Sequence, residues 1–185
     1  ALTYRNLFVH AIDKPPQVDG YRDEWADFEN NFIRLQSVDE HLEATMFAAQ
    51  HDRYLYLLLG VRDADVTYGQ HGDAVDIAFT DPGGQLRRFR IQPLAPGWIN
   101  AKQLGDGADP LTDSPAAGLI RGEWQNHAHG YTLELRVPRD MLQDRLSLRF
   151  FDSRNHQVLA SGPMFPANAL GRLIEHAVPL SETLA

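Results

Sequence analysis

Residues 131–137 read YTLELRV, and this stretch alternates strictly between apolar and polar side chains. Successive side chains of an extended strand point to opposite faces, so the four apolar residues share one face and the three polar residues share the other. The pattern predicts a half-buried β-strand, because the apolar positions of a helix recur every three or four residues.

The same pattern recurs on both sides of this stretch. Residues 75–79 and 146–150 alternate in the same way, and residues 54–61, YLYLLLGV, are apolar on both faces. A strand with two apolar faces is typical of the centre of a sheet that is covered on each side. Many short strands separated by turn residues are typical of a sandwich. We therefore expect an all-β fold, an antiparallel, jelly-roll-like β-sandwich with one or two short helical turns.

The chain has 185 residues, which suffice for one hydrophobic core and are too few for two comfortable ones. We predict a single domain over residues 1–185. The composition is 43% hydrophobic and 23% charged, which is ordinary for a globular protein and argues against general disorder. The sequence has no run of about 20 apolar residues that could span a bilayer.

The formal net charge of −8 argues against a nucleic-acid partner, because binding to phosphates requires clustered cations. The densest basic run is RRFR at residues 87–90, where Arg88 and Arg90 would share one strand face, and we interpret it as a solvated edge or a ligand contact. The sequence has no cysteine, which excludes disulfides, thiolate zinc sites and cysteine nucleophiles.

Motifs of catalysis are missing from the sequence. It contains no nucleophile elbow, no zinc-protease helix, no phosphate-binding loop and no dinucleotide fingerprint. His127 and His129 would place two imidazoles on one strand face, a spacing that metal sites use, but no third ligand is evident and a polar hairpin is the competing interpretation. We expect no enzymatic activity from this segment.

An acidic cluster follows the apolar strand at residues 54–61. Asp63, Asp65 and Asp73 supply the hard oxygen ligands that calcium prefers. The cluster lacks the spacing of an EF-hand loop, so a solvated acidic loop is the alternative. The three residues are our candidate calcium ligands, and calcium is the only cofactor that we consider.

The three tryptophans differ in their surroundings. Trp25 follows a turn and is predicted to fill the core. Trp98 follows a Pro-Gly turn that can project its ring outward, and Trp124 lies on a predicted strand among polar residues. An aromatic face beside polar groups suits a small ligand. The candidate ligand-binding residues are Trp98, Trp124, Arg90, Asn126 and Tyr68.

The order of four stretches resembles that of the family 9 carbohydrate-binding modules. They are PPQVDGYRDEW at 15–25, HDRYLYLLLGVRDADV at 51–66, GDAVDIAFTD at 72–81 and GYTLELRVPRDML at 130–142. The resemblance extends from Val18 to about Asp152. It implies an antiparallel β-sandwich that holds sugars between aromatic rings, with structural calcium in many members. Trp98 and Trp124 are then the candidate rings.

Three longer stretches are similar to the extracytoplasmic sensor segment of certain proteobacterial histidine kinases. They are LFVHAIDKPPQVDGYRDEW at 7–25, RRFRIQPLAPGWINA at 87–101 and IRGEWQNHAHGYTLELRVPRDML at 120–142. This resemblance implies a periplasmic domain of an inner-membrane protein, flanked by transmembrane helices that are its only membrane contact. It also implies a parent histidine kinase through which the domain can form a homodimer.

From these observations we expect the periplasmic sensor domain of a two-component histidine kinase, which binds a small ligand or a glycan without transforming it. The first alternative is a carbohydrate-binding module of a secreted polysaccharide-degrading enzyme. The second is a sandwich that contacts other proteins and binds no sugar.

Overall fold

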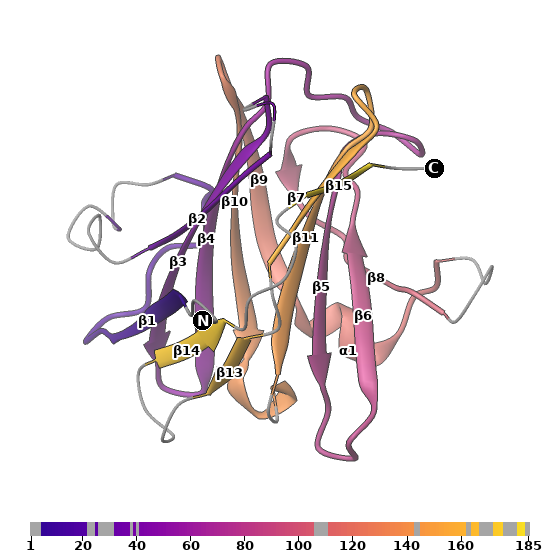
Figure 1. The fold of residues 1–185 in the computed structure, drawn as a ribbon. Coiled ribbons are helices and arrows are strands. Elements are labelled where there is room, and N and C mark those ends of the chain that lie inside the picture. Colours follow the sequence, from indigo (N-terminus) through magenta and orange to yellow (C-terminus); the bar gives the residue numbers. More distant parts are fainter. Residues whose placement is uncertain are drawn as a thin grey trace, which may run out of the picture.

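The alternating stretch of residues 131–137 forms most of strand β10 (Gly130–Pro138), which lies between β9 (Arg121–His127) and β4 (Tyr54–Arg62) and is antiparallel to both. The computed structural model describes residues 5–21, 25, 32–37, 39, 41–105, 111–142, 145–161, 164–166, 172–175 and 181–183. In this part of the chain the strands form two sheets, and helix is confined to short turns. The predicted all-β sandwich is confirmed, and Figure 1 shows its two layers.

The first sheet contains the longest strands. Its order is β7 (Gly97–Trp98), β9, β10, β4 and β3 (Glu43–His51). Two further strands share the free edge of β3: β2 (Ile33–Gln36) pairs with its beginning, and β1 (Arg5–Ala11) pairs with its end. β4 is therefore central in this sheet, as its two apolar faces predicted.

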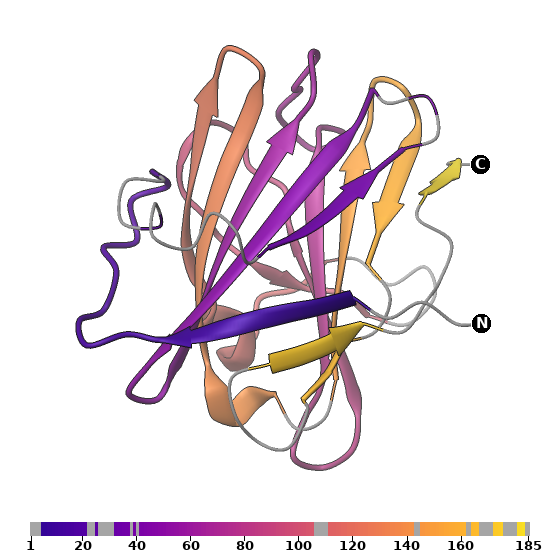
Figure 2. The same cartoon turned by 60° about the vertical axis from the view of Figure 1, so that its left-hand side comes forward.

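The second sheet faces the first and is joined to it by β1. Its order is β14 (Arg172–Glu175), β13 (Met164–Pro166), β11 (Leu146–Asp152), β5 (Ala74–Thr80), β6 (Leu86–Ile91) and β8 (Lys102–Gln103), and β12 (Gln157–Ala160) pairs with β11 and β15 (Ser181–Thr183). Figure 2 shows β1 running beside β14. β1 pairs in parallel with β3, which departs from the purely antiparallel sandwich that we predicted. The departure arises because β1 is shared between the two sheets.

The inward side chains of both sheets meet in one hydrophobic core. Leu133 and Leu135 of the first sheet and Leu148 and Phe150 of the second are fully buried members of this cluster. Full burial of such a side chain stabilises the fold by about 1.5–3 kcal/mol relative to exposure. The alternation of the strands thus supplies the main stabilisation of the sandwich.

The outer face of the first sheet carries a second, smaller apolar cluster. Phe47, Ala49, Tyr56 and Leu58 are buried there under Trp25, whose side chain is 2% exposed. The prediction that Trp25 is a core residue is confirmed. The segment of residues 12–21 lies on this outer face with Trp25, and we call it the N-terminal strap.

Two short helices lie between strands of the sandwich. A 3-10 helix, Arg139–Met141, follows Pro138 directly after β10. Ser114 caps helix α1 (Pro115–Leu119) by accepting a 3.0 Å hydrogen bond from the Ala117 N–H. Neither of these helices, nor any other in the described residues, has the length and apolarity needed to cross a bilayer.

Candidate functional site

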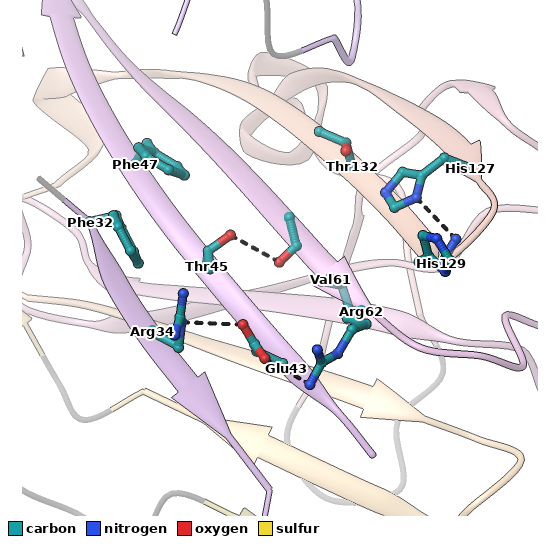
Figure 3. A pocket seen from close by; sticks show the side chains of 11 residues that line it. Phe32, Arg34, Glu43, Thr45, Phe47, Val61, Arg62, His127, His129 and Thr132 are labelled. Atoms are coloured by element: carbon teal, nitrogen blue, oxygen red, sulfur yellow. Dashed lines mark hydrogen bonds and ion pairs between the residues drawn. The ribbon is translucent and has the colours of Figure 1, made fainter. Parts of the chain in front are cut away.

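A groove of about 440 Å³ lies on the outer face of the first sheet, within the general size range of small-molecule sites, roughly 300–1,000 Å³. We call it the outer groove. Its floor follows a row of cross-strand neighbours, in which Thr45 of β3 pairs with Gly60 of β4 and Gly60 pairs with Thr132 of β10. These side chains are small, so the floor lies below its neighbours. The lining residues, shown in Figure 3, are Phe32, Arg34, Glu43, Thr45, Phe47, Gly60, Val61, Arg62, His127, His129 and Thr132.

The glycine in this floor is needed for the shape of the groove. A Cβ atom at Gly60 would lie 2.9 Å from the Thr45 Oγ1 atom, which is too close for two unbonded atoms. The Thr45 hydroxyl in turn donates a 3.4 Å hydrogen bond to the Gly60 carbonyl. The floor is therefore close-packed, and any larger side chain at position 60 must project into the groove.

Two arginines and one glutamate form a charged edge of the groove. Arg34 Nε lies 3.2 Å from Glu43 Oε1, and Arg62 Nη2 lies 2.9 Å from Glu43 Oε2. The side chain of Glu43 is 15% exposed, whereas those of Arg34 and Arg62 are 58% and 56% exposed. The two cations therefore face solvent, and the carboxylate lies beneath them.

The turn between β9 and β10 forms another edge of the groove, next to Arg62, which pairs with Gly130. His127 and His129 are exposed there, and the His129 N–H donates a 3.3 Å hydrogen bond to the His127 Nδ1 atom. These residues form the polar hairpin that was one of our two interpretations. Both imidazoles line the groove, as Figure 3 shows.

A buried carboxylate fixes the N-terminal strap beside the groove. Glu134 of β10 is 0% exposed and accepts hydrogen bonds of 3.3 Å from the N–H groups of Asp19 and Gly20. The indole Nε1 of Trp25 donates a further 3.2 Å bond to it. Burial raises the pKa of Glu134 to about 7, and these bonds, which favour the charged form, offset only part of that rise.

A second set of buried carboxylates lies inside the sandwich. One oxygen from each of Asp63, Asp73 and Asp152 lies within 4.8 Å of the others. All three residues are at most 3% exposed, and burial, followed by the neighbouring Asp73, raises the pKa of Asp63 to about 7. Burial raises the pKa of Asp152 as well. Three acids this close repel one another unless a cation or protons neutralise them.

The oxygens of this cluster are only partly used by the described residues. The Asp65 N–H donates to Asp63 Oδ1 at 2.9 Å, and the Ser153 N–H donates to Asp73 Oδ1 at 3.0 Å. The Oδ2 atoms of Asp63 and Asp73 are buried and accept no hydrogen bond from the described residues. Unpartnered, buried carboxylate oxygens suit a hard cation, so the donor set fits calcium.

Two of the three predicted calcium ligands belong to this cluster. Asp63 and Asp73 lie in it, but the side chain of Asp65 is exposed, with its Oδ2 atom 3.9 Å from Arg154 Nε. Asp65 contributes its backbone N–H instead. Our prediction missed Asp152, which follows the inward positions Leu148 and Phe150 on β11. An aspartate at an inward position of a strand is the signal that could have identified it.

The two predicted rings lie in different environments. Trp98 on β7 is 72% exposed and pairs with Glu123 of β9. Trp124 is 0% exposed and stacks on Tyr131 at 3.8 Å between ring centroids. The side chain of Trp124 points inward as part of the core, so its ring has no face available to a ligand in this arrangement.

Of the other predicted binding residues, Arg90 lies apart, whereas Tyr68 and Asn126 lie together. Arg90 donates two hydrogen bonds of 2.8 and 2.9 Å to Asp76, and its guanidinium lies 4.8 Å above the Phe151 ring, on the outer face of the second sheet. The Tyr68 hydroxyl donates a 2.8 Å bond to Asn126 Oδ1. The structure therefore brings Tyr68 and Asn126 together and leaves Arg90 and Trp98 at separate places.

Comparison with solved structures identifies similar folds. A family 9 carbohydrate-binding module (CBM9) from Caldicellulosiruptor kristjanssonii in complex with cellotriose has a TM-score of 0.53 and 14% identity, over 91% of this chain and 82% of the module. A CBM9 from the same organism in complex with glucose has a TM-score of 0.50 and 17% identity, over 91% and 84%. No family model and no curated protein matches the chain. The chain thus has a CBM9-like β-sandwich fold, as its sequence resemblance implied.

Proposed function

We propose that the chain is a non-catalytic glycan-binding domain whose ligand lies in the outer groove. The observation that carries the proposal is the composition of this groove, in which hydroxyl, imidazole and guanidinium groups surround a floor of small residues next to the Phe32 and Phe47 rings. Sugars need both hydrogen-bonding groups and an apolar wall. Two solved domains with this fold are complexes with cellotriose and glucose, which supports the same ligand class.

The chemistry of the groove supports binding rather than catalysis. A typical glycosidase needs two carboxyl groups on opposite sides of the scissile bond. Among the described residues that line the groove, Glu43 is the only carboxylate, and its two oxygens are ion-paired with Arg34 and Arg62. We therefore propose no enzymatic step for this segment.

For the context of the domain, we propose the extracytoplasmic sensor of a periplasm-facing histidine kinase. A bound ligand would then shift the kinase between two states only by its difference in affinity for them. A module of a secreted polysaccharide-degrading enzyme fits the CBM9-like fold equally well. The complete parent sequence distinguishes the two, because one has transmembrane segments and a kinase core and the other has a hydrolase domain.

We also propose that Asp63, Asp73 and Asp152 hold a calcium ion. When bound, calcium supplies the positive charge that three neighbouring buried carboxylates lack. The three residues come from the segment after β4, the residue before β5 and the end of β11, so they connect both sheets. The role of this site is structural, since the cluster is buried.

Isothermal calorimetry with glucose, cellotriose and a panel of oligosaccharides tests glycan binding. Gly60→Val fills the floor of the groove, so it should abolish any detected binding, and a thermal melt establishes that the variant is folded. Ser147→Val, which adds a similar side chain to the outer face of the second sheet, is the matched control and should bind normally. If Gly60→Val binds as tightly as the wild type, the ligand lies elsewhere, and if no glycan binds, the protein-interaction alternative is favoured.

A further inference from the structure

The outer groove has a local charge opposite to that of the chain as a whole. The chain has a formal net charge of −8, but the described lining of the groove contains two guanidinium groups and one carboxylate. The carboxylate of Glu43 is mostly covered, whereas more than half of each arginine side chain is exposed. An incoming ligand therefore meets two cations before it meets the anion.

We propose that the ligand of the outer groove is an acidic oligosaccharide, in which uronate carboxylates bind at Arg34 and Arg62. This inference rests on the proposed function and specifies the substrate class of the same site. A guanidinium presents a planar fork of N–H donors that matches a carboxylate, which makes arginine suitable for this recognition.

Glu43 positions the two cations for this role. Its two oxygens bind one arginine each, so the single carboxylate holds both guanidinium groups on the same edge of the groove. Arg62 makes this contact through Nη2, which leaves other donors of its fork on an exposed side chain. More than half of each arginine side chain is exposed, so a ligand carboxylate can reach both guanidinium groups from the solvent side.

The remaining surface of the groove suits the sugar part of such a ligand. Thr45 and Thr132 carry hydroxyl groups along the floor, and His127 and His129 carry imidazoles at the β9–β10 turn, next to Arg62. The groove crosses four neighbouring strands, β2, β3, β4 and β10, which corresponds to roughly 14 Å at the usual strand spacing. This span favours an oligosaccharide over a single sugar.

Phe32 forms the apolar end of the groove and connects it to the charged edge. Its ring lies 5.2 Å from that of Phe47 between centroids, and the Arg34 guanidinium lies 5.5 Å from its centroid. A sugar ring in contact with the edge of Phe32 would therefore have its carboxylate next to a cation. Combined apolar and cationic contacts of this kind select for a charged sugar over a neutral one.

Calorimetry at low salt with trigalacturonate and cellotriose tests the inference. We expect trigalacturonate to bind at least about tenfold more tightly, because hydrogen bonds to charged groups are the stronger ones. Arg62→Gln should lower the trigalacturonate affinity about tenfold and lower the cellotriose affinity by clearly less, because only the former ligand carries carboxylates. Arg88→Gln, at an exposed strand position on the outer face of the second sheet, is the matched control and should change neither affinity. Arg34→Gln provides a second variant, and thermal melts establish that each is folded.

Three results would overturn the inference. If cellotriose binds and trigalacturonate binds no more tightly, the proposed function remains and the acidic ligand is rejected. If poly-glutamate competes as well as trigalacturonate does, the groove recognises charge alone and the uronate assignment fails. If neither oligosaccharide binds, this inference is rejected, and the wider oligosaccharide panel decides whether the proposed function stands.

Discussion

The indole Nε1 of Trp25 donates a 3.2 Å hydrogen bond to the fully buried carboxylate of Glu134. The two residues are 109 positions apart in the sequence, so this bond connects the N-terminal strap to the first sheet. The same carboxylate accepts the N–H groups of Asp19 and Gly20. One side chain of β10 therefore organises the border of the outer groove.

Glu134 should make the stability of the protein depend on pH. Its pKa is about 7 in the folded state against 4.5 for an unperturbed group, so the folded protein holds a proton that the unfolded chain has lost between these values. This difference in proton binding contributes on the order of 3 kcal/mol to the free energy of unfolding. The contribution is fully present below pH 4.5 and is lost as the pH rises through 7. Urea denaturation at several pH values measures it.

The variant Glu134→Gln should not lose this stability as the pH rises from 4.5 to 7, because a glutamine side chain does not titrate. Other acids, Asp63 among them, are the same in both proteins, so the difference between the two pH profiles isolates Glu134. In Trp25→Phe the fall in stability should occur at higher pH, because the indole hydrogen bond that lowers the pKa of Glu134 is lost. Identical profiles for wild type and Glu134→Gln would show that the carboxylate does not titrate in this range.

Calcium should raise the melting temperature of the wild-type protein. A ligand that binds only the folded state stabilises it by about 2.7 kcal/mol at a hundredfold excess over its Kd. Asp73→Asn should remove this response, because it takes one carboxylate from the cluster. Asp65→Asn should keep it, because that side chain is exposed and outside the cluster. Melts in chelator and in calcium measure both effects.

The variant Asp63→Asn provides a sharper form of the same test. In chelator it should be more stable than the wild type, since it removes one of three mutually repelling buried charges. In calcium the order should reverse, because the variant has lost a ligand. A variant that keeps the same rank in both conditions would contradict a cation site.

Removal of the Trp124 ring should destabilise the protein far more than removal of the Trp98 ring. Trp124→Ala should cost about 3–5 kcal/mol, because it leaves a cavity beside Tyr131 in the core. Trp98→Ala should change stability by less than about 0.5 kcal/mol, as is usual for surface substitutions. Urea denaturation compares them, and a large cost for Trp98→Ala would mean that its ring is buried in solution.

The sequence predicted the strands well because alternation reports directly on which face is buried. The stretch at 131–137 and the doubly apolar stretch at 54–61 became β10 and β4, in the centre of the first sheet. The position of helix α1 could not be predicted from periodicity because it has only five residues, although Ser114 followed by Pro115 is a capping signal.

The candidate sites were predicted less well, because each is assembled from distant strands. Asp152 joins Asp63 and Asp73 only through the pairing of β11 with β5 and the facing of the two sheets. The outer groove depends on the register that aligns Thr45, Gly60 and Thr132. Polar residues at outward positions are ordinary in any strand, so their sequence offered no separate signal.

The turn at Gly20 should be essential for the docking of the N-terminal strap. Its φ of +80° favours glycine, and a Cβ atom there would lie 2.5 Å from Gln125 Cγ and 3.2 Å from the Glu123 carbonyl oxygen. Gly84 has a similar φ of +83° but no atom within 4 Å of its Cβ position, so Gly84→Ala measures the backbone cost alone, about 1–3 kcal/mol. Gly20→Ala should cost more than this control by the energy of the displaced contact, as measured by urea denaturation. Equal costs for the two variants would show that the strap does not pack against β9.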